Sequence, residues 1–354
     1  AIECIEAGAD WLGILTGDDN CPAAISVEQA KKVYAAIGDK ASKNAIIMVR
    51  DEEKLLQIAE EIKPDIIFSH NCQYFGTSEI AKYIRKNPNT RLYVDNHVDF
   101  SNINRSWLSE KILHGVLWKY CAKVLEPYAT KFYGVLPARV DFLVNIYGIS
   151  RNKVEYLPLG VEDDKAKSAR DSQKIKCFRN KFNVKDDDFL IVTGGKIDKF
   201  KKQTLYLMEA IHKLENPNVK LIVYGSVLPE IKKEFDNLVD GNRVQYAGWI
   251  TSDETYKYIA ASDLVVYPGR HSVLWEQTAG QGIPMICKYW EGTTHVDLGG
   301  NVKFLYKDSC EEILTILNEI IKDKSKYNMM KAIAEEKGEK YFSYNRIAKI
   351  SIDI

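Results

Sequence analysis

The chain has 354 residues, which is too long for one ordinary hydrophobic core and suits two domains. Apolar residues make up 45% and charged residues 28%, a balance that excludes a disordered or fibrous chain. Lys+Arg and Asp+Glu both number 49, so no overall field would attract nucleic acid, and we expect a small-molecule partner. The seven cysteines never form a CxxC pair, which favours reduced thiols in a cytoplasmic protein over a disulfide framework or a zinc site.

Short apolar segments alternate with helical stretches from end to end, as in parallel sheets covered by helices. The first half contains WLGIL (11–15), AIIMV (45–49), DIIFS (65–69), RLYVD (91–95), FYGVL (132–136) and VEYL (154–157). The second half contains FLIVT (189–193), VKLIVY (219–224), RVQYA (243–247), DLVVY (263–267), PMIC (284–287) and VKFL (302–305). The sequence therefore predicts an α/β protein of two doubly wound, Rossmann-like domains.

A polar, charge-rich segment over 162–188 separates the two halves and indicates a hinge followed by a surface helix. We place the boundary near Val161, with one domain over 1–161 and a second over 162–335. The helical pattern over 336–354 could return to the first domain. Ligands of open α/β sheets bind beyond the carboxyl ends of the strands, so we expect the site in a cleft between facing sheet edges.

The segment TGGKIDKFKKQ (193–203) follows a predicted strand and opens a helix. Gly194 and Gly195 would let an anion approach the backbone at the positive end of that helix. Lys196 and Lys201, five residues apart, could then place two ammonium groups on a diphosphate. The alternative is a solvated basic loop.

The segment DLVVYPGRHSVLWEQTAGQGIPMIC (263–287) predicts a buried strand, a turn, a helix and a further strand. Four polar residues follow the first strand end, where ligands usually bind: Arg270, His271, Ser272 and Glu276. His271 could donate to a sugar hydroxyl or a phosphate, or it could simply cap the helix.

From about Glu61 onward the chain resembles the retaining GT-B glycosyltransferases of family 4, the group 1 transferases. In that family a Gly-Arg pair and a Lys five residues later hold the donor diphosphate, which here corresponds to Gly195, Lys196 and Lys201. The resemblance implies that Gly225 and the turn GWI, with Trp249 and Ile250, flank the nucleotide. It also implies a GT-B fold in which two Rossmann-like domains face a cleft.

Further resemblance lies in KPDIIFSH (63–70), YVDNHVDF (93–100) and VEYLPLGVED (154–163). It implies that His97 contacts the transferred sugar from the acceptor domain. Asp95 and Asp99 flank His97 and could orient its ring, and His70 is a weaker candidate at another strand end.

The chain departs from the family's Glu-x7-Glu pattern, because Gly269 and Gln277 stand at the two glutamate positions. Glu276 adjoins the second position and could contact the donor ribose instead, while His271 falls near the shortened first loop. The resemblance implies a retaining reaction, and the missing first glutamate leaves an inverting outcome open.

The start of the chain does not fit this family. Residues 1 to about 60 resemble early βα units of phosphoribosylanthranilate isomerase, which makes a natural or engineered chimera an alternative. Isomerase activity is not expected, since the family's catalytic cysteine has no counterpart here.

The segment over 105–128 has apolar residues at helical spacing: Trp107, Ile112, Val116, Tyr120 and Val124. Lys111, Lys119 and Lys123 occupy other positions of this helix. We expect a core-packing helix, with peripheral contact to the inner face of a membrane as the alternative.

Together these observations predict transfer of a hexose from a nucleoside-diphosphate sugar to a hydroxyl acceptor on a glycan, a lipid-linked molecule or a small molecule. No Asp-x-Asp metal motif stands in a suitable place, so we expect no required metal and no cofactor beyond the donor. The alternatives are a catalytically impaired, chimeric nucleotide-binding protein and a nucleotide-sugar epimerase of the same fold.

Overall fold

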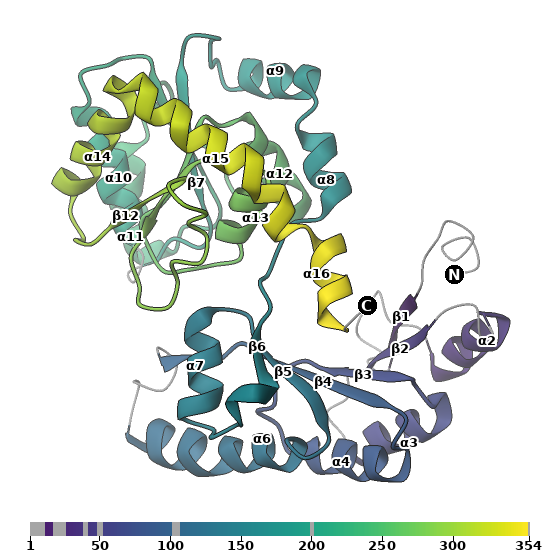
Figure 1. The fold of residues 1–354 in the computed structure, drawn as a ribbon. Coiled ribbons are helices and arrows are strands. Elements are labelled where there is room, and N and C mark those ends of the chain that lie inside the picture. Colours follow the sequence, from purple (N-terminus) through teal and green to yellow (C-terminus); the bar gives the residue numbers. More distant parts are fainter. Residues whose placement is uncertain are drawn as a thin grey trace. The chain divides into compact units, whose positions relative to one another are not determined.

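The computed structural model describes residues 11–16, 26–37, 42–47, 52–100, 107–198 and 202–352 (Figure 1). The chain divides into two compact units, Ala1–Leu157 and Pro158–Ile354. This division falls just before Val161, the boundary expected from the sequence.

Unit 1 contains a parallel sheet whose described strands lie in consecutive order, β1-β2-β3-β4-β5-β6. The strands are β1 Trp11–Thr16, β2 Ser42–Ile47, β3 Ile66–Ser69, β4 Arg91–Asn96, β5 Ala129–Gly134 and β6 Val154–Tyr156. The helices are α2 Val27–Ile37, α3 Glu52–Ile62, α4 Thr77–Lys86, η1 Ser109–Trp118, α6 Lys119–Leu125, α7 Pro137–Asn145 and η2 Arg151–Lys153. When consecutive strands are neighbours, right-handed crossovers place the connecting helices on the same face of the sheet. Accordingly, α3, α4 and α6 lie side by side along one face (Figure 1).

Unit 2 contains a second parallel sheet, with the order β12-β11-β10-β7-β8-β9. Its strands are β7 Phe189–Gly194, β8 Val219–Tyr224, β9 Val244–Tyr246, β10 Leu264–Tyr267, β11 Met285–Lys288 and β12 Val302–Leu305. Its helices are α8 Asp163–Ala169, α9 Ser172–Lys181, α10 Gln203–Lys213, α11 Pro229–Leu238, α12 Ser252–Ala261, α13 Leu274–Gly280, α14 Cys310–Lys322, α15 Lys324–Phe342 and α16 Tyr344–Ser351. The order reverses between β7 and β10, which makes their carboxyl ends the switch point where ligands of such sheets bind.

The expected α/β architecture is confirmed, and every predicted strand overlaps a strand of the structure. The doubly wound order is that of unit 2, while the described strands of unit 1 follow one another without a reversal. The helix expected to open at the segment 193–203 is present as α10. Its residues Leu205, Met208 and Ile211 are buried in the main core of unit 2, and Leu214 joins them just after the helix.

The prediction of a core-packing helix over 105–128 is wrong for most of the positions on which it rested. Trp107, Ile112, Val116 and Tyr120 are exposed, and the buried residues of this stretch are His114, Cys121, Ala122 and Leu125. Residues Ser109–Trp118 form a π-helix, but the buried residues His114, Cys121 and Leu125 still follow the i, i+7, i+11 spacing of one helix face. The stripe chosen from the sequence is a different face, which is exposed.

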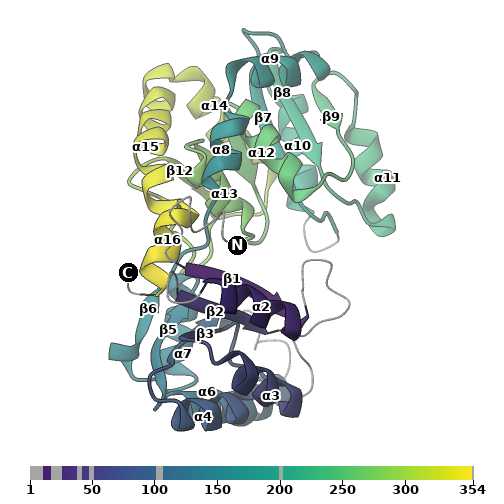
Figure 2. The same ribbon diagram turned by 90° about the vertical axis from the view of Figure 1, so that its right-hand side faces the viewer.

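The C-terminal residues belong to unit 2 by their contacts. Helix α15 packs against α13 and α14 and leads into α16 (Figure 2). The backbone of Val161 pairs with the turn between α15 and α16, since Val161 donates to the carbonyl of Phe342 and accepts from Tyr344. Within the described residues, no helix combines the length and the apolar character needed to cross a bilayer.

Candidate active site

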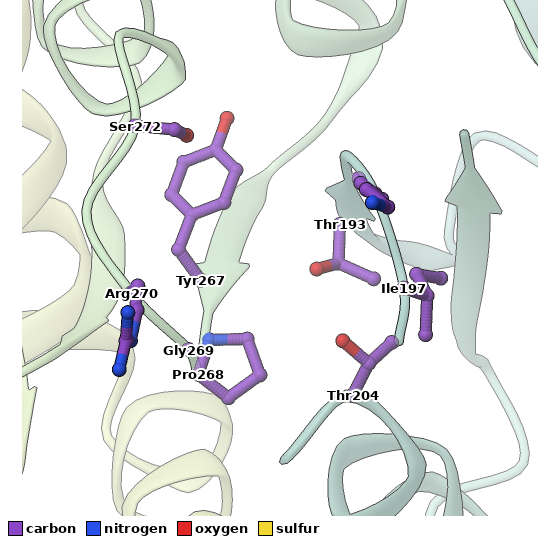
Figure 3. Close-up of a pocket in the computed structure, with 10 residues that line it drawn as sticks. Thr193, Ile197, Thr204, Tyr267, Pro268, Gly269, Arg270 and Ser272 are labelled. Carbon is purple, nitrogen blue, oxygen red and sulfur yellow. The ribbon is translucent and has the colours of Figure 1, made fainter. Parts of the chain in front are cut away.

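A pocket opens at the switch point of unit 2, where the chain leaves β7 and β10. Its empty volume is about 330 Å³, including space open to solvent. Figure 3 shows Thr193 at the end of β7, with Ile197 and Thr204 of the chain that follows, facing Tyr267 at the end of β10 and Pro268 just after it. The complete lining is Thr193, Gly194, Lys196, Ile197, Thr204, Tyr267, Pro268, Gly269, Arg270 and Ser272.

The glycines at the ends of β7 and β8 are required by close backbone packing. A Cβ on Gly194 would lie 2.1 Å from the Tyr224 ring, and one on Gly225 would lie 1.9 Å from the carbonyl oxygen of Gly195. Gly195 and Gly225 also have positive φ values of 122° and 115°, which side chains rarely adopt. These glycines let the two strand ends meet, and Gly194 additionally forms part of the pocket wall.

Cationic and donor groups converge on this pocket from both strand ends. Lys196 and Arg270 line it, together with the hydroxyls of Thr204 and Ser272. Thr204 stands in the first turn of α10, so the positive end of that helix also lies at the pocket. The arrangement suits an anion such as a diphosphate.

Several residues predicted for the site lie elsewhere or cannot be placed. Lys201 lies outside the described residues. Trp249 is 71% exposed, whereas Ile250 packs against a hydrophobic cluster of unit 2. Neither of them, nor Gly225 or Gln277, lines the pocket.

A histidine–glutamate–histidine cluster lies behind the pocket wall. Glu276, in the first turn of α13, is fully buried, and its Oε1 lies 2.9 Å from His271 Nε2 and 2.8 Å from His295 Nε2. Burial alone would raise the pKa of Glu276, but the charges and hydrogen bonds of the two histidines outweigh it and lower the pKa to about 2. Glu276 is thus an ionised carboxylate that holds His271 next to Arg270 and Ser272.

This burial separates Glu276 from the direct ribose contact expected from the sequence. Its Oε2 is buried and has no hydrogen-bond partner within the described part of the chain. His271 is itself only 10% exposed. Both residues therefore support the pocket loop from behind, and any contact with a ligand stays a prediction.

A second cluster of this kind lies in unit 1, at the carboxyl ends of β3 and β4. Asp95 Oδ2 lies 3.0 Å from His70 Nδ1 and 3.1 Å from His97 Nε2. Burial would raise the pKa of Asp95, but hydrogen bonds from the two histidines lower it to about 2. The hydrogen bond to Asp95 in turn raises the pKa of His70. Asp95 is therefore the residue that orients His97, while Asp99 pairs with Arg139.

Three residues of these sites were not among the predicted site residues. Arg270 was noted at the strand end, and its place at the switch point is the signal that could have included it. His295 lies in a loop without any local motif. Asn71 was missed as well, although it donates its backbone N–H to Asp95 and accepts from the backbone N–H of His97.

Comparison with known proteins shows what this arrangement is similar to. Residues 174–337 match the model of the group 1 glycosyl transferases. This range includes the whole pocket of unit 2 and the cluster behind it. The matched range is less than half of the chain.

A curated relative is the uncharacterized glycosyltransferase MJ1059 of Methanocaldococcus jannaschii, which is 24% identical over 248 residues. The alignment covers 66% of this chain and only 57% of that protein.

Solved structures share the fold at low identity. HepE of Anabaena in complex with UDP-glucose is 16% identical, with a TM-score of 0.66 over 96% of this chain and 98% of that one. A UDP-GlcNAc 2-epimerase of Neisseria meningitidis bound to UDP-GlcNAc is 12% identical, with a TM-score of 0.59 over 97% and 99%. The chain thus has the GT-B fold that its sequence predicts.

Proposed function

We propose that the chain is a glycosyltransferase that moves a hexose from a nucleoside-diphosphate sugar to a hydroxyl acceptor. One observation carries this proposal: Lys196, Arg270 and the start of α10 converge on a pocket at the switch point of unit 2. The match to the group 1 transferases spans this pocket, and the complex of HepE with UDP-glucose supports a donor of this class.

The positive groups suit the charge that develops during transfer. The bond between the anomeric carbon and the diphosphate oxygen breaks, and the electron pair stays with the nucleoside diphosphate. A new bond then joins the anomeric carbon to the acceptor oxygen, whose proton is released. Lys196, Arg270 and the N–H groups at the start of α10 would stabilise the departing diphosphate without a required metal. The proposed retaining outcome and the contact of His97 with the sugar rest on the family resemblance alone.

The diphosphate assignment is tested by titrating UDP calorimetrically into the K196A and R270A variants. A charge-assisted hydrogen bond contributes roughly 1.5–3 kcal/mol, so each substitution should weaken UDP binding by about 10-fold or more. K232A is the matched control, because Lys232 pairs with Asp236 on α11 and does not line the pocket. Equal UDP affinity in all four proteins, wild type included, would remove the basis of the proposal.

Two alternatives predict different products. An impaired nucleotide-binding protein would bind UDP and leave every donor sugar intact. An epimerase, which the similarity to the Neisseria meningitidis enzyme makes worth testing, would convert the sugar without any acceptor. NMR analysis of donor incubations with and without acceptor alcohols separates these outcomes from transfer.

For the acceptor, we propose a lipid-linked molecule reached by peripheral contact of unit 1 with a membrane surface. The support is the exposed apolar side chains of the η1–α6 helix and the residues next to it: Trp107, Leu108, Ile112, Val116, Leu117 and Tyr120. Phe75, also exposed, packs on Trp118 of the same helix. Six exposed apolar side chains within residues 107–120 suit an interaction surface.

A further inference from the structure

We propose that His70, Asp95 and His97 form a binding site for a divalent transition metal such as Zn²⁺. This site would lie at the carboxyl ends of β3 and β4 in unit 1 and shares no residue with the diphosphate pocket of unit 2. A metal here would differ from the sequence-based expectation, which included no metal-binding residues.

The three side chains already have nearly the spacing of metal ligands. Their ligand atoms all lie within 4.8 Å of one another, and the two histidine nitrogens lie 3.0 and 3.1 Å from Asp95 Oδ2. Bonds of about 2.0–2.1 Å around a tetrahedral zinc ion separate its ligand atoms by roughly 3.3 Å. The two N···Oδ2 distances are already near this value, and the two histidine nitrogens, at most 4.8 Å apart, would have to approach each other by no more than about 1.5 Å for a metal to replace the shared hydrogen bonds.

Neighbouring groups hold two of the ligands in place. Asp95 Oδ1 accepts the backbone N–H of Asn71 at 2.7 Å, which leaves Oδ2 for the histidines. The side-chain oxygen of Asn71 accepts the backbone N–H of His97 at 2.9 Å. Asn71 itself has a positive φ of 69°, a conformation that asparagine tolerates better than most residues. Hydrogen bonds that orient ligands in this way are typical of metal sites.

Access and ligand chemistry favour this cluster over its counterpart in unit 2. The His70 side chain is 70% exposed, so a hydrated ion could reach the site and keep positions for water or a substrate hydroxyl. In the unit 2 cluster Glu276 is fully buried and His295 is 2% exposed, which leaves no comparable entrance. Two imidazoles with one carboxylate suit Zn²⁺ or Co²⁺ better than Mg²⁺ or Ca²⁺, which prefer oxygen ligands alone.

The test uses Co²⁺ as a spectroscopic probe of the full chain after treatment with a chelator. We expect one tightly bound equivalent with visible absorption in the range of imidazole-bound cobalt, and displacement of that cobalt by Zn²⁺. H70Q, D95N and H97Q should each weaken Co²⁺ binding by at least about 10-fold. Since His70 is largely exposed, H70Q should fold normally, and its thermal unfolding serves as the check.

H212Q provides the matched control, because His212 lies near a different carboxylate, Asp240, and outside the cluster. Its Co²⁺ affinity should equal that of the wild type. The proposal is overturned if the wild type binds no Co²⁺, or if H70Q binds it as tightly as the wild type does. Metal binding does not depend on the proposed transfer, so UDP titration of the same variants distinguishes failure of this site from failure of the donor pocket.

Discussion

At the scale of single residues, the buried carboxylate of Glu276 is the most consequential charge of unit 2. It lies between two histidines, and one of them precedes Ser272 of the pocket wall. A buried ion that loses its counter-charge destabilises a fold strongly. The pocket loop and the stability of unit 2 are therefore linked through one side chain.

We predict that E276Q destabilises the protein at neutral pH and that the effect declines in acid. Folding lowers the pKa of Glu276 from 4.5 to about 2. The ionised carboxylate therefore contributes its full stabilisation at pH values above about 4.5, and this contribution is lost as the pH falls from there toward 2. The shift corresponds to a loss on the order of 3 kcal/mol at pH 7. Denaturant unfolding of both proteins at pH 7 and near pH 3 measures it, and an equal difference at the two pH values would contradict the assignment.

We predict that G225A is more destabilising than the matched substitution G241A. Both glycines have positive φ, of 115° and 71°, so an alanine is strained at either position. At Gly225 the added Cβ would also meet the Gly195 carbonyl at 1.9 Å, whereas nothing lies within 4 Å of one at Gly241. We expect a cost of roughly 1–2 kcal/mol for G241A and clearly more for G225A in urea unfolding. Comparable losses would show that the strand ends can separate easily.

At the scale of elements, buried strands could be predicted and helix faces less reliably. The strands of unit 2 are mostly apolar because both faces of a parallel sheet are covered. The predicted strands VKLIVY and VKFL coincide with β8 and β12 at both ends. In the helix over 107–125 the spacing predicts the helix but not which of its faces is buried. His114 is buried on the same face as Cys121 and Leu125, whereas Val116 belongs to the more apolar but exposed stripe.

This helix also carries the membrane prediction. The double variant W107S/Y120S should lose at least about 10-fold in binding to vesicles of phosphatidylglycerol and phosphatidylcholine, measured by co-sedimentation. Both side chains are 67% exposed, and transfer of large aromatic groups to a membrane interface contributes most of such binding. Lys111 and Lys123 are paired with Glu110 and Glu126, so added salt should reduce binding only weakly.

Y306S controls for general loss of surface apolar area, because Tyr306 is 65% exposed in unit 2. It should bind vesicles like the wild type. A wild-type protein that stays in the supernatant at every lipid concentration would show that this face serves another purpose.

At the scale of the whole molecule, the two units and one of the two segments that line the donor pocket could be predicted from the sequence. Strand-to-helix turns with glycine and lysine are local signals, so Gly194 and Lys196 were predicted from one segment. Which strand lies beside β7 is not a local property, and only the pairing of β7 with β10 brings Arg270 opposite Lys196. The same reasoning explains His295, which reaches Glu276 from a loop that follows another strand.

The consecutive strand order of unit 1 has a consequence for how the chain is made. Each described strand from β2 to β6 pairs with the one synthesised just before it, so the sheet can grow at one edge while translation proceeds. In unit 2 the strand synthesised first, β7, lies between β8 and β10 in the folded sheet. Its second neighbour, β10, is synthesised only some seventy residues after β7. The strands of unit 1 are therefore synthesised in the order in which they pair. In unit 2 the central strand β7 lacks one of its two neighbouring strands until β10 has been synthesised.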